Sequence, residues 1–325
     1  MSKAGPICQE FELLLACPVC NQKLLHDTNS YICASDDCRR SYPILNELPI
    51  LISDAVGTFS STSYVEERRI KSQKISWKSR LRSLIPRISA NYVALKNLDE
   101  FSRLLLRENA EPLVVVLGGA EAGAGMERIL GDKALRVLES DVAVGGRTQI
   151  VFDASHIPLQ TGSVDGIIIQ AVLEYIPDPA QAVAEIYRVL KPQGIVYSEM
   201  PFMQDVHGGR YDFTRLTHLG HLRLYRRFAE ISSGACGGPG TALAWALQHF
   251  FLSFVRAPWQ RDLTKIFTGL SFFWLKYFDR FLLATPGGLD GASGTYLLAR
   301  KNDQELSDRQ LIARYRGAVP PGKII

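Results

Sequence analysis

Four cysteines near the N-terminus form two closely spaced pairs, Cys17-Pro-Val-Cys20 and Cys33-Ala-Ser-Asp-Asp-Cys38. The spacing C-x2-C-x12-C-x4-C places two thiolates on each of two turns, an arrangement that surrounds a tetrahedral zinc ion. We therefore predict a structural zinc site whose ligands are Cys17, Cys20, Cys33 and Cys38. Because four protein ligands leave no open position on the metal, the activity must come from the rest of the chain.

A glycine-rich segment, Gly118-Gly-Ala-Glu-Ala-Gly-Ala-Gly125, directly follows an apolar run at 113–117. Glycines allow the backbone to approach a ligand closely, and the N-terminus of a following helix offers unpaired N–H groups. Polar residues also end three later apolar runs, at 139–141, 153–155 and 170–174. Because open α/β sheets bind ligands at the carboxyl ends of their strands, these segments predict one cofactor site with a carboxylate available for ribose hydroxyls.

A second group of chemically active side chains lies in the segment 200–218, which follows the fifth predicted strand and should overhang the same edge of the sheet. A substrate hydroxyl that acts as a nucleophile benefits from a general base, and histidine suits that role near neutral pH. His207 is the first catalytic candidate, followed by Asp205 and His218, although an ordinary structural hydrogen bond also explains each histidine. Chemistry directed at a carbonyl or nitrogen needs no such base, so these candidates do not determine which substrate atom reacts.

Alternating strand and helix patterns must position these groups. Strands are expected at 113–117, 135–138, 148–152, 164–169, 194–198, 229–235 and 294–301, and a helix with apolar spacing at 179–190. Regular alternation of this kind implies a mostly parallel sheet with helices on both faces. The fold class is therefore α/β.

The segments 152–158, 163–169, 171–174 and 185–194 together resemble the motifs of class I S-adenosylmethionine-dependent methyltransferases, of the kind called methyltransferase type 11. The resemblance extends over about residues 112–230 and the final strand. It implies a Rossmann-like sheet of seven strands and S-adenosylmethionine as the cofactor.

The N-terminal module has a resemblance of its own. Leu15-Ala-Cys-Pro-Val-Cys20, Tyr42-Pro-Ile44 and Leu48-Pro-Ile-Leu51 are similar to the zinc-ribbon family typified by a small activator of tRNA and protein methyltransferases. This resemblance implies a structural Zn²⁺ and a small domain attached to a larger enzyme.

The methyltransferase resemblance also implies roles for single residues. The cofactor-binding residues would be Gly118, Gly119, Gly123, Gly125, Asp141, Asp153, Ala154 and Gln170. The glycine loop would hold the methionine part of the cofactor and Asp153 with Ala154 the adenine. Asp141 would bind the ribose, with Glu139 as the alternative.

Two departures from the family pattern are visible. Val116 stands where the family usually has an acidic residue, and the glycine loop is longer than usual. The cofactor amino group then needs another partner, for which Glu121 is the candidate. Glu174 stands where relatives often place a polar residue that faces the cofactor or substrate, and a degenerate domain without cofactor is the alternative.

We divide the chain into a zinc-ribbon domain at 1–53, a linker and basic segment at 54–110, a methyltransferase domain at 111–302 and a charged tail at 303–325. Residues 68–87 contain eight basic residues and no acidic one. A basic amphipathic helix of this kind lies on anionic lipid or RNA, or packs as an ordinary surface helix.

A helical insertion is expected at about residues 240–285, where two helices each carry an apolar face. The first face comprises Leu243, Leu247, Phe250, Phe251, Phe254 and Val255, and the second runs from Leu263 to Phe281. These faces could cover a lipid acceptor, anchor the protein in one leaflet, or pack on each other or on a second subunit in a homodimer. Packing is the commoner outcome of an amphipathic stripe.

Composition limits the class of protein. The 325 residues include 46% hydrophobic ones and carry a net charge of +4, which is typical of a globular protein and too weak to indicate nucleic acid alone. No run reaches the roughly 20 apolar residues of a membrane-spanning helix, and the N-terminus shows no signal-peptide pattern. Zinc-spaced cysteines indicate a reducing compartment, so we expect a cytoplasmic protein, with Cys8 and Cys236 as buried thiols and peripheral membrane contact as a further expectation.

The stretch Tyr211-Asp-Phe-Thr-Arg-Leu-Thr217 is similar to one in methyltransferases associated with glycan and lipid modification. This resemblance implies transfer of a methyl group to a saccharide or a lipid-linked intermediate. An RNA base is the first alternative acceptor, because certain ribosomal RNA guanine methyltransferases also carry an N-terminal zinc ribbon, although with a histidine where this chain has Cys38. A catalytically inactive module that docks on a partner enzyme is the second alternative.

Overall fold

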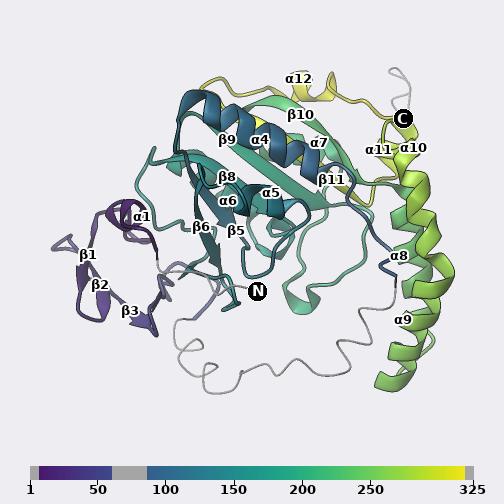
Figure 1. Ribbon diagram of the computed structural model, residues 1–325, viewed down its shortest axis with the longest axis horizontal. Coiled ribbons are helices and arrows are strands. Elements are labelled where there is room, and N and C mark those ends of the chain that lie inside the picture. Colours follow the sequence, from purple (N-terminus) through teal and green to yellow (C-terminus); the bar gives the residue numbers. More distant parts are fainter. Residues whose placement is uncertain (1–6, 61–85, 319–325) are drawn as a thin grey trace.

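The computed structural model describes residues 7–60 and 86–318. A sheet of seven strands forms its centre, in the order β10-β11-β9-β8-β5-β6-β7 (Figure 1). The strands are β5 (Leu113–Leu117), β6 (Arg136–Asp141), β7 (Ile150–Val151), β8 (Val164–Gln170), β9 (Leu190–Pro201), β10 (Phe228–Gly237) and β11 (Gly294–Lys301). Neighbours from β7 to β9 are parallel, and β11 runs antiparallel between β9 and β10. The predicted Rossmann-like sheet is confirmed.

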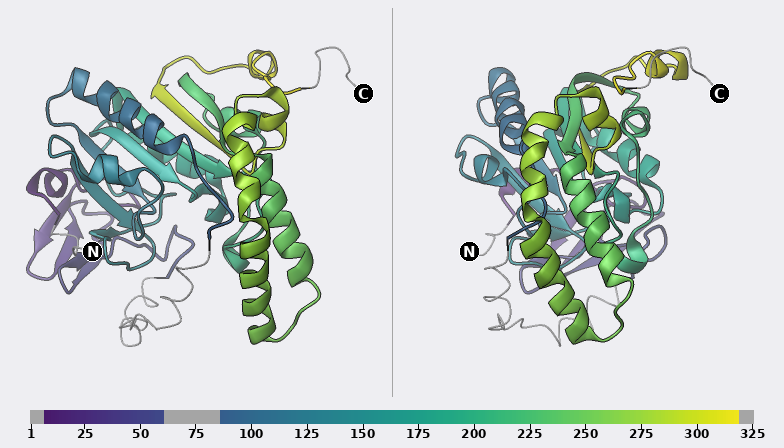
Figure 2. Two further views of the ribbon diagram at one scale, coloured as in Figure 1. Left: turned by 45° about the vertical axis from the view of Figure 1, so that its right-hand side comes forward. Right: turned by 90° about the vertical axis from the view of Figure 1, so that its right-hand side faces the viewer.

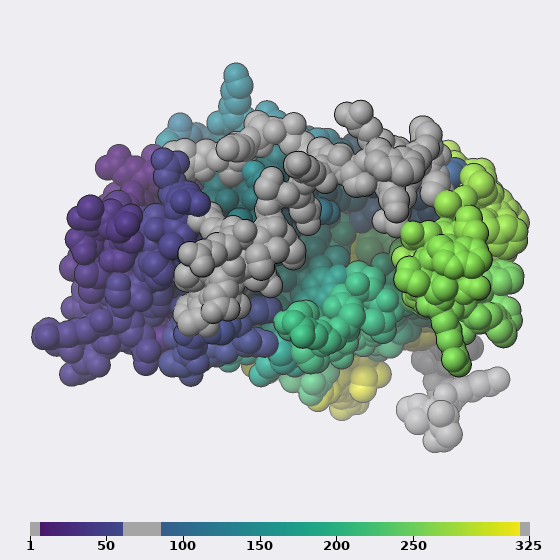
Figure 3. All heavy atoms as spheres, turned by 90° about the horizontal axis from the view of Figure 1, so that it is seen from below, coloured from purple at the N-terminus to yellow at the C-terminus, as the bar shows by residue number. Residues whose placement is uncertain are grey.

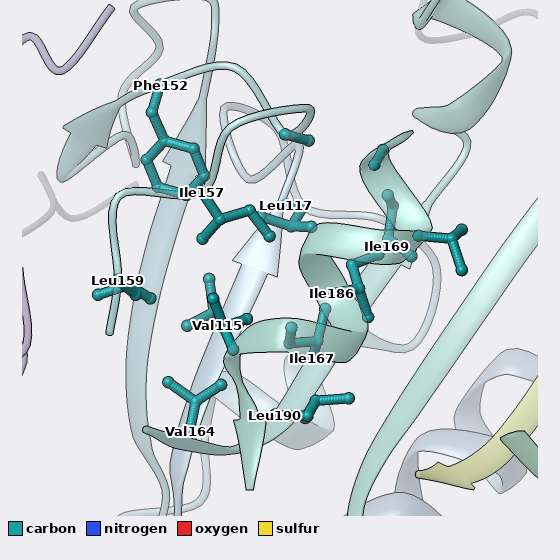
Figure 4. Close-up of a cluster of buried hydrophobic side chains, with 14 of the residues drawn as sticks. Val115, Leu117, Phe152, Ile157, Leu159, Val164, Ile167, Ile169, Ile186 and Leu190 are labelled. Atoms are coloured by element: carbon teal, nitrogen blue, oxygen red, sulfur yellow. The ribbon is translucent and has the colours of Figure 1, made fainter. Parts of the chain in front are cut away.

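Helices cover both faces of this sheet because its central strands are apolar on both sides. On one face, Val114 and Val116 of β5 pack with α4 (Ala94–Glu108) and α5 (Met126–Leu130). On the other face, Val115 and Leu117 pack with α6 (Pro179–Val189), and α7 (His218–Leu224) lies in the same cluster. Figure 4 shows this second cluster, in which Ile186 of α6 lies over the strands. Alternation along one buried strand therefore supplies both cores.

The strand limits differ from the prediction most clearly in three places. The second strand continues to Asp141, the third is only Ile150–Val151, and the fifth begins at Leu190, where the predicted helix was expected to end. The expected basic helix at 68–87 falls almost entirely on residues 61–85, outside the described part of the chain. A short helix in the tail, α12 (Asp308–Ile312), lies within the charged segment.

A four-stranded sheet and one helix form the N-terminal module. Its elements are α1 (Gln9–Leu13), β1 (Leu24–Asp27), β2 (Ser30–Cys33), β3 (Ser41–Leu45) and β4 (Leu48–Pro49). The module joins the edge of the large sheet, because the Leu51 N–H donates to the Val151 carbonyl at 2.8 Å. Buried Phe11 and Leu15 belong to the same hydrophobic cluster as the large sheet. The small module thus shares its core with the α/β domain.

A helical insertion follows β10 and contains most of the remaining helices. They are α8 (Pro239–Leu252), α9 (Pro258–Phe272), η3 (Phe273–Phe278), α10 (Asp279–Leu282) and α11 (Pro286–Asp290). Buried Asp279 fixes its base by accepting hydrogen bonds from the backbone N–H groups of Gly238, Gly240 and Thr241. Figure 2 shows α8 and α9 standing side by side and extending beyond the body of the domain.

Within the single chain, the apolar faces of the insertion pack on each other only in part. Phe251 packs against Phe267 and Phe272 between the helices, but most of the large side chains face solvent. Exposed examples are Leu243, Phe250, Phe254, Leu263, Leu270, Trp274 and Phe281. Each helix has an apolar face wider than its contact with the other helix, so part of both faces stays exposed. Among the described residues, no helix is both long and apolar enough to cross a membrane.

Candidate cofactor and acceptor site

A cavity of about 440 Å³ lies at the carboxyl ends of β5, β6 and β8. Six of the eight residues predicted to bind a cofactor line it, namely Gly118, Gly123, Asp141, Asp153, Ala154 and Gln170. Glu121, the candidate partner of the amino group, lines it as well. Small-molecule sites commonly enclose about 300–1,000 Å³, so the cavity is large enough for a nucleoside with an amino-acid tail.

The glycine loop follows β5, and its glycines have different structural tasks. Gly118 has φ +82°, and a Cβ atom there would lie 2.2 Å from a Val172 methyl carbon. Gly125 has φ +77° and precedes α5, where a Cβ would meet the backbone of Leu95 at 2.8 Å. Gly119 packs against Glu139. Gly119 and Gly125 were also expected to contact the cofactor, but they do not line the cavity. Their close contacts with Glu139 and Leu95 instead allow the loop to take its shape.

Asp141 ends β6 with its carboxylate at the cavity wall. Its Oδ2 accepts a hydrogen bond from the Ala120 N–H at 3.0 Å and its Oδ1 one from the Ala143 N–H at 2.8 Å. Burial raises the pKa of Asp141. Glu139, the alternative ribose ligand, is held by Arg147 through bonds of 2.8 and 2.6 Å and lies outside the cavity lining. Of the two, Asp141 alone presents its carboxylate to a ligand.

The far wall of the cavity includes Phe59, which sequence reasoning missed. It comes from the stretch expected as a linker, and its ring lies 5.9 Å from the ring of Tyr211 on η2 (Gly209–Tyr211). The preceding Thr58 N–H donates to Asp153 Oδ2 at 3.3 Å. A lone aromatic residue in a Ser/Thr/Gly-rich stretch was the only sequence signal. The segment leaving the N-terminal module therefore helps to close the cavity.

Glu174 and His207 form a pair next to the cavity. Glu174 lies on η1 (Leu173–Tyr175) with no exposed surface, and its Oε1 is 3.6 Å from His207 Nε2. Within the described residues, its carboxylate oxygens have no hydrogen-bond partner. Tyr175 lines the cavity and contacts the His207 ring edge-on at 5.6 Å. Glu174 raises the pKa of His207.

The loop that carries His207 is held by its own polar contacts. The Asp205 carbonyl accepts a hydrogen bond from His207 Nδ1 at 3.1 Å, and Asp212 accepts one from the His207 N–H at 3.0 Å. Arg215 pairs with both carboxylate oxygens of Asp212. This network fixes the ring orientation, so that Nδ1 donates to the Asp205 carbonyl and Nε2 faces Glu174.

The side chains of the other two catalytic candidates lie away from the His207 ring. The Asp205 carboxylate faces His249 of α8, with 3.7 Å between Oδ2 and Nε2, and does not line the cavity. His218 is buried beside Ser233, whose hydroxyl is 2.7 Å from Nε2, and burial lowers its pKa to about 4. The structure therefore does not bring the three candidates together. His218 has the environment of a structural histidine.

The four predicted metal ligands do come together. The sulfur atoms of Cys17, Cys20, Cys33 and Cys38 all lie within 4.8 Å of one another. Two Zn–S bonds of about 2.3 Å at a tetrahedral angle separate their sulfurs by about 3.8 Å, and the Cys17–Cys38 separation is 3.8 Å. The Tyr42 hydroxyl lies 3.2 Å from the Cys17 sulfur. The cluster is compatible with a zinc ribbon.

The two remaining cysteines lie apart from this cluster. Cys236 is buried as expected, whereas Cys8 is only half-buried.

Comparison with known proteins agrees with this geometry. Residues 131–198 match the family model of a methyltransferase domain. A chloroplastic protein of Arabidopsis thaliana, named as an uncharacterized methyltransferase, is 30% identical over 150 residues, which are 42% of this chain and 39% of that protein. The match thus spans well under half the length of this relative.

Solved structures with a similar fold include two methyltransferases. Phosphoethanolamine N-methyltransferase 2 of Haemonchus contortus, in complex with S-adenosyl-L-methionine, is 14% identical with a TM-score of 0.40, over 63% of this chain and 52% of that one. The 1,6-didemethyltoxoflavin-N1-methyltransferase of Burkholderia thailandensis is 15% identical with a TM-score of 0.37, over 83% of this chain and 98% of that one. These distant similarities identify no substrate.

Proposed function

We propose that the chain transfers the methyl group of S-adenosylmethionine to a hydroxyl acceptor, since residues 131–198 match a methyltransferase domain and lie in a mostly parallel sheet of seven strands. The cavity at the carboxyl ends of β5, β6 and β8 carries this proposal. It combines a glycine loop, a strand-end carboxylate and an apolar wall in the order that an amino-acid tail, a ribose and an adenine require. When bound, the cofactor supplies an activated methyl group on its sulfonium.

The donor set of the cavity fits this cofactor. Asp141 accepts backbone hydrogen bonds from Ala120 on Oδ2 and from Ala143 on Oδ1, and because a carboxylate has about four acceptor positions, lone pairs remain for ribose hydroxyls. Phe59 and Ala154 offer apolar surface for the adenine, and Glu121 offers a negative charge for the amino group. The loop backbone after Gly118 provides a close approach for the methionine part.

The pair of Glu174 and His207 gives the acceptor side its chemistry. His207 Nε2 takes the proton of an acceptor hydroxyl, and the buried Glu174 carboxylate stabilises the imidazolium that results. Methyl transfer itself depends mostly on positioning, so the loop contacts that orient His207 matter as much as its basicity. This arrangement supports a hydroxyl of a saccharide or a lipid-linked intermediate as the acceptor. In this proposal the four cysteines hold a structural Zn²⁺.

The test is a calorimetric titration with S-adenosylhomocysteine, and with NAD⁺ in parallel because Rossmann-like pockets also bind dinucleotides. We expect micromolar binding of S-adenosylhomocysteine, about −8 kcal/mol, and none of NAD⁺. Zinc-loaded protein that binds neither ligand would contradict the proposed enzyme and favour the docking module. Binding of NAD⁺ alone would assign a different cofactor.

Phe59→Ala is expected to weaken S-adenosylhomocysteine binding about tenfold. Stacking of a base on an aromatic ring contributes about 1–3 kcal/mol, and about 1.4 kcal/mol corresponds to a factor of ten. Phe254→Ala, which removes an exposed ring from the insertion, is the matched control and should bind as the wild type does. Equal affinities of both variants would show that Phe59 does not contact the ligand.

The titration midpoint of the His207 imidazole, its pKa, is expected to lie above the ordinary histidine value because of the Glu174 carboxylate. Glu174→Gln removes the negative charge that favours the protonated ring, so the midpoint should fall. ¹⁵N NMR of the imidazole measures it, with the signal assigned by its loss in His207→Gln. Because a base must be neutral, turnover should rise with pH through this midpoint.

Asp205→Asn is the control for this titration, since Asp205 contacts His207 through its backbone carbonyl. Its midpoint should stay close to that of the wild type. An unchanged midpoint in Glu174→Gln would show that the Glu174 charge does not act on His207, and it would remove Glu174 from the proposed mechanism.

A further inference from the structure

The α8–α9 pair is an unusual exposed surface for a single chain. It extends past the sheet on the side where the loop after β9 hangs (Figures 1 and 2). Figure 3 views the molecule from that side and shows the pair, in light green, at one end and the N-terminal module, in purple, at the other. The pair is therefore a projection beside the face that receives the acceptor.

Large aromatic side chains concentrate where α8 turns into α9, at residues 250–267. Phe254 is 73% exposed and Trp259 is 63% exposed. Phe250, Leu263 and Phe267 continue this surface, and each is more than half exposed. Apolar surface of this size is costly in water and marks an interaction site. Aromatic rings at the end of a projecting helical hairpin can enter the headgroup region of a bilayer without movement of the rest of the protein.

Positive charges flank these rings. Residues 239–285 contain five Lys or Arg residues and two Asp residues, and one of these, Asp279, is buried at the base of the insertion. Arg256, Arg261 and Lys265 are exposed close to the turn. A tip that combines rings with exposed cations is complementary to an anionic lipid surface, where the rings enter the headgroup zone and each cation is attracted to phosphate.

The same charges disfavour a second copy as the occupant. In a twofold dimer that joins the two tips, each patch meets itself. The exposed cations Arg256, Arg261 and Lys265 would then lie near those of the other copy, with one exposed acidic residue of the tip, Asp262, beside them. Like charges in excess at an interface are unfavourable. A bilayer surface accepts both the rings and the charges.

We propose that the turn between α8 and α9 docks the protein on an anionic membrane surface. Docking holds the acceptor face against the bilayer, and, resting on the proposed function, it assigns the acceptor to the lipid-linked class. His249 of α8 lies 3.7 Å from the Asp205 carboxylate, so the docking hairpin directly contacts the loop that carries His207.

Flotation of the full-length, zinc-loaded protein with phosphatidylglycerol vesicles tests the proposal, with phosphatidylcholine vesicles beside them. The wild type should float with the anionic vesicles and much less with the neutral ones. The double variant Phe254→Ser with Trp259→Ser should lower the partition coefficient at least about tenfold. The double variant Arg256→Glu with Arg261→Glu should remove the preference for anionic lipid.

A matched control replaces two exposed apolar residues elsewhere, Leu95→Ser with Ile312→Ser, and should float as the wild type does. If the tip variants also float like the wild type, the proposal is overturned. The proposal is also overturned if sedimentation shows that the wild type is a dimer and that the tip variants are monomers. Titration of each preparation with S-adenosylhomocysteine separates failure of docking from failure of the proposed function.

Discussion

Asp141→Ala is expected to lower the affinity for S-adenosylhomocysteine by about a hundredfold or more. In the proposed cofactor site the half-buried Asp141 carboxylate accepts two ribose hydroxyls, and hydrogen bonds to a charged group contribute about 1.5–3 kcal/mol each. Loss of two such bonds therefore removes about 3 kcal/mol or more, which corresponds to at least about a hundredfold. Calorimetric titration of the zinc-loaded protein measures the change.

Two further variants show whether the effect is local. Asp99→Ala removes an exposed carboxylate that pairs with Arg128 on the far side of the loop and should leave the affinity unchanged. Asp141→Asn keeps the side-chain shape that supports the Ala120 and Ala143 N–H groups and should retain the fold while losing most of the affinity. If Asp141→Ala bound like the wild type, the ribose would lie elsewhere in the cavity.

The sheet was predictable because its signals are local. Each apolar run is short and bounded by polar or glycine residues, and the alternation along β5 from Val114 to Leu117 supplies both faces. Because parallel strands end at one edge, the glycine loop, Asp141 and Asp153 could be placed together before any geometry was known. The final strand at 294–301 came from the family resemblance, whereas the order of the strands and the antiparallel direction of β11 were not predicted.

Features that depend on long-range contacts were not predictable. Phe59 lines the cavity only because the N-terminal module pairs with the edge of the large sheet, and nothing in its own segment specifies that edge. The contact between Glu174 and His207 joins residues 33 positions apart on two separate loops. The insertion presents a periodic apolar pattern, but periodicity does not say whether another element covers the face.

Replacing Cys17 by serine is expected to remove the proposed zinc ion and destabilise the N-terminal module. Structural zinc contributes about 10–16 kcal/mol to folding in zinc-finger peptides, and a module this small has little core of its own. Its core is continuous with that of the large sheet, and its exit segment carries Phe59 into the cavity. We therefore expect a lower melting temperature and at least about tenfold weaker S-adenosylhomocysteine binding, since the stacking contact of Phe59 is lost as well.

Cys8→Ser is the matched control, because Cys8 belongs to the same module but lies outside the four-sulfur cluster. It should keep one zinc per chain by elemental analysis and bind S-adenosylhomocysteine as the wild type does. Zinc retained in Cys17→Ser would remove this cysteine from the ligand set. Loss of zinc with unchanged cofactor affinity would show that the cavity forms without a folded N-terminal module. Phe59 would then occupy the cavity wall without support from that module. The two measurements therefore separate a passive appendage from a module that completes the cofactor site.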